Sequence, residues 1–186
     1  MLLSNFVRWA GLAAVLAGGL VTIDDLAILV FTLAQGAAGG LPFRAVVEWV
    51  TLVLLLLGLV GLYVFRSEAL GDLGLVGFLA AFFATALTPT LSGRFVLTSS
   101  LGWILFGAAC LASRSYPRAA VILLIVGALL SGVVNALLVS GALTGSPVLL
   151  VVAVISNIIF SGARGWLGFD LFTGRGEEAQ RFWPVS

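Results

Sequence analysis

The sequence predicts an all-α membrane protein, a bundle of six transmembrane helices joined by short loops. Three observations predict this fold. The 186-residue chain is 61% hydrophobic and only 9% charged, with a mean hydropathy of +1.22, whereas a soluble domain is about 45–50% apolar and about 25% charged. Its apolar stretches are long enough to cross a bilayer. The connections between them are short and rich in Gly, Pro and Ser, which mark turns.

Six stretches approach the roughly 20 mostly apolar residues that a membrane-spanning helix needs. The first is overlong, and the second, VVEWVTLVLLLLGLVGLYVF, has the cleanest pattern. No connection is long enough to separate two soluble domains, so we expect one membrane domain over 1–172 and a cytoplasmic tail over 173–186. The expected spans are 7–34, 46–65, 70–87, 95–112, 119–143 and 148–172.

The distribution of arginine predicts the orientation of the bundle. All nine basic residues are arginines, and with the N-terminus in the cytoplasm only Arg44 and Arg94 fall on the outer side. Because cytoplasmic loops are enriched in positive charge, both termini are predicted to be cytoplasmic. The seven arginines assigned to the inner side are Arg8, Arg66, Arg114, Arg118, Arg164, Arg175 and Arg181.

The composition excludes several kinds of chemistry. Without histidine there is no imidazole for haem ligation or general-base catalysis, and no Ser-His or Cys-His nucleophile. The single cysteine, Cys110, forms no internal disulfide and is expected to be a small buried side chain. A net charge of +1 gives no electrostatic field that would attract nucleic acid. No metal or cofactor is therefore expected, although a lipid, quinone or pigment could lie between the helices without an axial imidazole.

Two adjacent carboxylates, Asp24 and Asp25, lie inside the first apolar stretch. A carboxylate at the bilayer centre costs at least about 2.5–3.5 kcal/mol, and neighbours on one helix point about 100° apart. The glycine pair at 18–19 weakens a helix. Thr22, followed three residues later by an acid, matches a capping box. We therefore expect the first helix to be broken or kinked near residues 18–22, with both acids at the start of a new helix.

The two aspartates have other interpretations. In the structural hypothesis they satisfy backbone donors, with Arg44 or Arg94 as counter-charges. In the functional hypothesis they form a cation or proton site at a broken helix, as in many transporters. If the bilayer lies nearer the cytoplasmic side than the expected spans place it, both aspartates simply face the outer headgroups or water.

Further polar residues and small residues lie inside the expected spans. Asn135 and Asn157 fall on the two helices of the last hairpin and are expected to hydrogen-bond across it. Ser131 is a further polar candidate inside the spans, with contacts between helices as its expected role. A small-molecule pocket is the alternative. Small residues spaced four apart indicate close helix packing. These pairs are Ala14/Gly18, Ala80/Ala84, Ala108/Ala112, Gly127/Ser131 and Ala128/Gly132.

Two further aspartates allow one enzyme hypothesis, an intramembrane aspartyl protease. Intramembrane aspartyl proteases carry a GxGD motif and a second membrane aspartate, and Asp72 and Asp170 fall on the same predicted side. The stretch Ala69-Leu70-Gly71-Asp72 resembles this motif but lacks its first glycine. An acid at a helix start also complements the helix dipole, which explains Asp72 without catalysis.

Three stretches resemble an uncharacterised family of small polytopic bacterial membrane proteins with six helices. They are LGLVGFLAAFFATALTP, RAAVILLIVGALL and GARGWLGFDLFTGRGEEAQR, which together cover around half of the chain. The resemblance implies a multi-pass protein of the bacterial cytoplasmic (inner) membrane and carries no catalytic signature.

These observations favour a non-enzymatic integral membrane protein. We expect an accessory or structural subunit that acts through helix–helix contacts, because the chain has little extramembrane mass and many small-residue pairs. Its expected partners are the lipid bilayer, other membrane subunits or further copies of itself, and no nucleic acid. The alternative is a small solute, ion or proton transporter or channel that uses Asp24 and Asp25.

Overall fold

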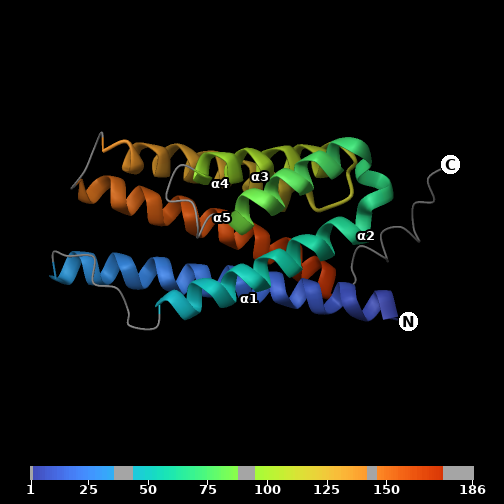
Figure 1. Ribbon diagram of the computed structural model, residues 1–186, viewed down its shortest axis with the longest axis horizontal. Coiled ribbons are helices and arrows are strands. Elements are labelled where there is room, and N and C mark those ends of the chain that lie inside the picture. Colours follow the sequence, from blue (N-terminus) through green and yellow to red (C-terminus); the bar gives the residue numbers. More distant parts are fainter. Residues whose placement is uncertain (1, 36–43, 88–94, 142–145, 174–186) are drawn as a thin grey trace.

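The computed structural model describes residues 2–35, 44–87, 95–141 and 146–173, and these residues form five α-helices and no β-strand (Figure 1). Four of the helices are long and apolar enough to cross a membrane, whereas the third is shorter. This confirms the predicted all-α fold and its membrane character. The helices are α1 (Leu2–Gln35), α2 (Arg44–Leu87), α3 (Phe95–Ala112), α4 (Arg118–Val139) and α5 (Pro147–Thr173).

The predicted count of six helices is not confirmed, because the expected spans 46–65 and 70–87 belong to one element, α2. Its backbone leaves helical angles at Arg66 (φ −130°, ψ 20°) and at Gly71 (φ 57°, ψ −159°). The four residues between them, SEAL, include good helix formers, so they continue as a helical turn where a loop was expected. The two arms of α2 on either side of this bend run in opposite directions (Figure 1).

A tyrosine from the turn between α3 and α4 supports the bend of α2. The hydroxyl of Tyr116 donates a hydrogen bond to the carbonyl oxygen of Leu62. In a regular helix that carbonyl accepts from the N–H of residue 66, and Arg66 is where the backbone departs from the helix. Tyr116 is buried, and this burial raises the pKa of its hydroxyl well above the usual range. The hydroxyl therefore stays protonated and able to donate.

The expectation that α1 is broken near residues 18–22 is wrong, because α1 is one continuous helix from Leu2 to Gln35. Thr22 does not cap a new helix: its Oγ1 donates to the carbonyl of Gly18, 2.9 Å away and one turn earlier. Gly18 instead allows a close approach to α5, since a Cβ there would lie 2.7 Å from the carbonyl oxygen of Ser161. Thr22 Oγ1 also lies 3.2 Å from Ser161 Oγ. The glycine is a contact surface between helices, as is common in membranes.

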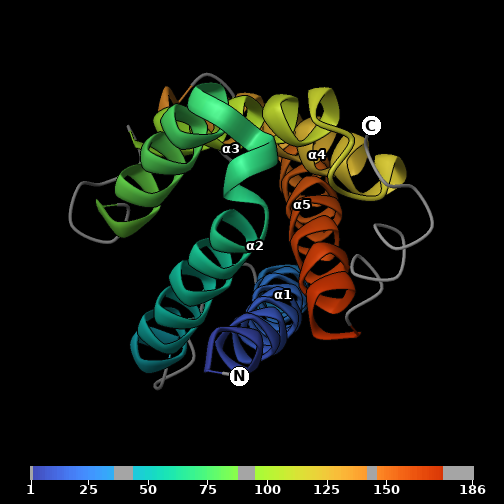
Figure 2. The ribbon, with the colours of Figure 1, turned by 90° about the vertical axis from the view of Figure 1, so that its right-hand side faces the viewer.

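The helices pack as an elongated bundle (Figures 1 and 2). α1 packs most extensively on α5, α4 contacts both α3 and α5, and α2 contacts α1 and α3. The start of α1 and the end of α5 lie at the same end of the bundle (Figure 1). Fully buried aromatic and aliphatic side chains fill the centre, and they include Trp103, Phe106, Leu124 and Leu167.

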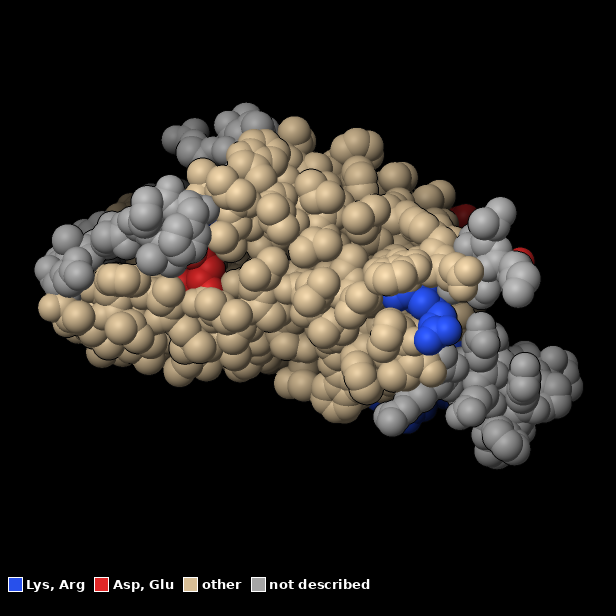
Figure 3. Space-filling view, turned by 90° about the horizontal axis from the view of Figure 1, so that it is seen from below, with Lys and Arg blue, Asp and Glu red and all other residues tan. Residues whose placement is uncertain are grey.

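The outer surface of the bundle is apolar. Large hydrophobic side chains on every helix are exposed, for example Val30 (63%), Val53 (54%) and Leu101 (59%). Figure 3 shows one such face, on which charged side chains appear at only a few places. An apolar exterior around a packed interior is the pattern of a helical protein surrounded by lipid.

Candidate functional site

A buried arginine lies at the centre of the candidate site. Arg164 comes from α5, where it lies between the buried Ala163 and Leu167, and only 7% of Arg164 is exposed. Its guanidinium carbon lies 4.1 Å from the ring centre of Phe160 and 5.5 Å from that of Trp103 on α3. Its Nε has no hydrogen-bond partner among the described residues. A buried cation is therefore held by two aromatic rings.

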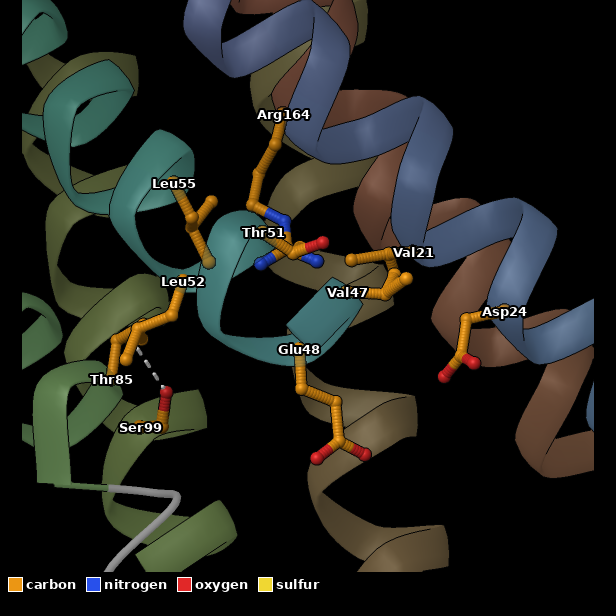
Figure 4. A pocket seen from close by; sticks show the side chains of 10 residues that line it. All are labelled: Val21, Asp24, Val47, Glu48, Thr51, Leu52, Leu55, Thr85, Ser99 and Arg164. Carbon is orange, nitrogen blue, oxygen red and sulfur yellow. Dashed lines mark hydrogen bonds between the residues drawn. The ribbon is translucent and has the colours of Figure 1, made fainter. Parts of the chain in front are cut away.

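The guanidinium of Arg164 reaches a pocket of about 440 Å³ between α1, α2, α3 and α5 (Figure 4). Two sides of the pocket are apolar, and three hydroxyl groups and two carboxylates complete the wall. A second buried polar atom without a partner in the described residues, the Oγ1 of Thr51, also lines it. The lining residues are Val21, Asp24, Val47, Glu48, Thr51, Leu52, Leu55, Thr85, Ser99 and Arg164.

Hydroxyl groups from α2 and α3 connect the pocket wall to the aromatic support of Arg164. Thr85 Oγ1 and Ser99 Oγ lie 3.2 Å apart, joined by a hydrogen bond (Figure 4). The indole Nε1 of Trp103 donates to the same Thr85 Oγ1 over 3.3 Å. Trp103 therefore presents its ring to Arg164 while its N–H fixes the far wall of the pocket.

The structure brings Asp24 and one of its predicted counter-charges together. Arg44 Nε lies 3.8 Å from Asp24 Oδ2 and 2.8 Å from Glu48 Oε1. The second ion pair joins residues four apart on α2, a spacing that puts them on one helix face. The other predicted counter-charge, Arg94, lies outside the described residues.

Asp25 contacts α5 instead of Arg44, because neighbouring residues on a helix point about 100° apart. Asn157 Nδ2 on α5 donates to Asp25 Oδ1 over 3.4 Å, and Asn157 Oδ1 accepts from Ser131 Oγ on α4 over 2.6 Å. Asn135 Nδ2 in turn donates to the carbonyl oxygen of Ser131 (2.8 Å) and to its Oγ (3.2 Å). The predicted polar residues thus form one chain of donors that ends on the Asp25 carboxylate, with Ser131 between Asn135 and Asn157.

Sequence reasoning did not single out Arg164 as a site residue. It counted Arg164 among the inner-side arginines, although the residue lies within the expected span 148–172. An arginine with apolar sequence on both sides, as in FSGARGWLGF, was the signal available, because ionisable residues inside a membrane span usually mark a functional site. Thr51, Thr85, Ser99 and Trp103 were also missed.

The remaining candidates lie elsewhere. Asp72 is exposed at the bend of α2, Asp170 is half-buried near the end of α5, and neither lines the pocket. Cys110 is buried, as expected. Among the described residues, no group of three or more Cys, Asp or Glu side chains could hold a metal ion.

The apolar helical bundle, with a partly charged pocket between its helices, defines an α-helical membrane protein. Comparison with protein-family models, with curated proteins and with solved structures finds no match for this chain.

Proposed function

We propose that this chain is a non-enzymatic transport protein of the bacterial inner membrane, which binds a small polar solute in the pocket at Arg164 and moves it across the bilayer. The observation that carries the proposal is the buried guanidinium facing a pocket between four helices. Arg164 lies nine residues before the end of α5, about 14 Å along the helix. Charges at that depth in a membrane protein mark solute and ion pathways.

The energetics of Arg164 favour a binding role over a purely structural one. Removing an ion from water costs several kcal/mol even after relaxation. A cation–π contact returns about 0.5–2 kcal/mol, so Phe160 and Trp103 offset only part of that cost. The Asp25 carboxylate adds attraction at longer range, and a pocket that admits water and a polar solute supplies further stabilisation.

The accessory-subunit hypothesis loses part of its support. Several of the small residues that motivated it pack against helices of the same chain. A Cβ on Gly127 would lie 2.7 Å from the Phe160 backbone, and a Cβ on Gly168 would lie 2.5 Å from the Ala14 side chain. Such residues are not available to a partner protein. The pocket does not support the protease hypothesis, because its lining contains neither Asp72 nor Asp170.

The proposal keeps both termini cytoplasmic. Arg66 and Arg164 are buried, so they do not count as loop charges. Without them, five arginines still fall on the inner side and two on the outer side, which is the bias expected of this orientation.

Aqueous access to the pocket tests the proposal. In a Cys110→Ala background, Ser99→Cys places a near-isosteric thiol in the pocket wall, and Leu101→Cys places one on the exposed apolar surface of the same helix. In proteoliposomes, we expect a membrane-impermeant thiol reagent to label Ser99→Cys from at least one side and to leave Leu101→Cys unlabelled. Labelling of neither variant from either side would overturn the proposal.

Translocation is tested separately, by light scattering from proteoliposomes that swell in iso-osmotic solutions of small organic acids, amines and amides. At least one class should enter faster than into protein-free liposomes, and Arg164→Gln should remove the difference. If no class enters faster and native mass spectrometry finds a stoichiometric partner protein, the accessory-subunit hypothesis replaces this one.

A further inference from the structure

We infer that the pocket binds a small organic anion, with a carboxylate-type oxyanion on Arg164 and a short apolar body against the aliphatic side of the pocket. The inference rests on the proposed solute-binding role and names the class of solute. It is carried by the pairing of charges in the pocket, by the geometry of the guanidinium and by the size of the space.

Among the described residues, the charged side chain of the pocket wall that has no ion pair is the cation. Three charged side chains line the pocket: Asp24, Glu48 and Arg164. Both carboxylates lie close to Arg44, at 3.8 Å and 2.8 Å. In the described part of the chain, Arg164 makes no ion pair within 4.0 Å and its Nε has no hydrogen-bond partner; the Asp25 carboxylate acts on it only at longer range. An anionic solute would give Arg164 the close partner that it lacks, whereas a cationic solute would have to compete with Arg44 for the carboxylates.

The geometry of Arg164 suits a planar oxyanion. The rings of Phe160 and Trp103 lie against the guanidinium, at 4.1 Å and 5.5 Å, and the guanidinium projects toward Thr51 in the pocket (Figure 4). A guanidinium offers its N–H groups in a rigid fork that matches the two oxygens of a carboxylate. The hydroxyl of Thr51, on the facing helix, has no hydrogen-bond partner among the described residues and is a second donor in this position.

The size and lining of the pocket limit the solute to a small monoanion. A volume of 440 Å³ is near the lower end of ligand pockets, which range from about 300 to 1,000 Å³. The aliphatic lining residues Val21, Leu52 and Leu55, from α1 and α2, suit a short hydrocarbon body. Asp24 and Glu48 line the same space and disfavour a second negative charge on the solute.

The test uses three probes of nearly equal shape: isobutyrate, isobutyramide and isobutylamine. Each is added to proteoliposomes of the Cys110→Ala/Ser99→Cys protein, and the rate of thiol labelling is measured. We expect saturating isobutyrate to slow labelling about 10-fold, while the amide and the amine have little effect. Protection by the amine but not by the carboxylate would overturn the inference.

Variants of Arg164 show whether the protection depends on the guanidinium. Arg164→Gln should abolish protection by isobutyrate, Arg164→Lys should weaken it at least about 3-fold because the fork is lost, and the exposed Arg118→Gln control should retain it. Protection that is unchanged in both Arg164 variants contradicts the inference. If Arg164→Gln does not fold, Arg164→Lys decides the question.

An anionic lipid headgroup presents the same oxyanion chemistry and is distinguished by vesicle composition. A lipid source is identified by three results obtained without added acid. Labelling is slow in phosphatidylglycerol vesicles, fast in phosphatidylcholine vesicles, and fast in phosphatidylglycerol vesicles when the protein carries Arg164→Gln. If neither isobutyrate nor phosphatidylglycerol protects, the inference is wrong while rapid labelling of Ser99→Cys still supports a solute pocket. If Ser99→Cys is never labelled, the proposed function itself fails.

Discussion

The guanidinium carbon of Arg164 lies 4.1 Å from the ring centre of Phe160, which is one helical turn earlier on α5. Trp103 meets the same phenylalanine edge to face, with 5.7 Å between ring centres. A residue of α5 and a residue of α3 therefore hold the buried cation jointly, and this contact couples the packing of the two helices to the position of the charge.

Replacing Phe160 by leucine is expected to destabilise the protein by about 1–2 kcal/mol, because it removes a cation–π contact and an aromatic pair. The free energy of unfolding is measured in detergent with a chemical denaturant. Phe169→Leu, at a position on the same helix that is 46% exposed, is the control and should change stability by less than about 0.5 kcal/mol. Equal losses in the two variants would contradict the role given to Phe160.

Gly18→Ala is expected to destabilise the protein by about 1–3 kcal/mol, since the added methyl group overpacks the contact between α1 and α5. A Cβ there would lie 2.7 Å from the carbonyl of Ser161, whereas at Gly19 it would meet nothing within 4 Å. Gly19→Ala should therefore be neutral or slightly stabilising, because alanine favours a helix. Thermal unfolding of both variants checks this. If Gly19→Ala were the more damaging change, the continuous helix would be in doubt.

The two glycines show how far the sequence predicts the fold. Composition and apolar lengths predicted the all-α membrane bundle, because those properties are summed over many residues. The glycine pair was interpreted as a weak point in α1, yet Gly18 lies in a tight contact with Ser161, 143 residues further along the chain. A glycine that breaks a helix and a glycine that lets two helices touch look alike until the partner helix is known.

The candidate site was likewise predicted from the sequence only in part. The angular separation of Asp24 and Asp25 follows from helix geometry, and the pairing of Arg44 with Asp24 followed from their signs and predicted side. Arg164 was missed because the count of positive charges assigned every arginine to a side of the membrane. Thr51 was missed because an isolated threonine in an apolar span has no signal until α5 is placed beside it.

A double-mutant cycle between Ser131 and Asn157 should give a coupling free energy of about 0.6–1.7 kcal/mol, between the average and the largest value measured for hydrogen bonds between membrane helices. Ser131 Oγ donates to Asn157 Oδ1 over 2.6 Å. The cycle uses Ser131→Ala and Asn157→Leu, with unfolding free energies measured in detergent. The control cycle pairs Ser131→Ala with Ser156→Ala; in the described part of the chain, the Ser156 hydroxyl bonds only to the carbonyl of Val152 on its own helix. A coupling free energy no larger than that of the control would show that the hydrogen bond between Ser131 and Asn157 does not stabilise the contact between α4 and α5.

Tyr116→Phe is expected to lower the unfolding free energy by about 1–3 kcal/mol, because the buried carbonyl of Leu62 loses its donor. Burial raises the pKa of the Tyr116 hydroxyl above its ordinary value of 10.0. The folded protein therefore keeps the proton at a pH where the unfolded chain loses it. Stability from this group is complete below pH 10 and is lost as the pH rises further. The difference between wild type and Tyr116→Phe should accordingly shrink above pH 10, and a constant difference would argue against the buried hydrogen bond.

Gly71→Ala is expected to weaken the bend of α2 through the backbone alone. Gly71 has φ 57° and ψ −159°, a combination that is open essentially only to glycine and costs another residue about 1–3 kcal/mol. A Cβ at Gly71 would meet nothing within 4 Å, so no steric overlap contributes. Gly162→Ala is the matched control, because its Cβ is equally unobstructed but the residue lies inside α5 with ordinary helical angles. Unfolding free energies should fall for Gly71→Ala and stay level or rise for Gly162→Ala.

The bend also sets the second arm of α2 against α3. Weakening it by Gly71→Ala should therefore raise the labelling rate of Ser99→Cys. An unchanged labelling rate would show that the bend does not determine access to the pocket.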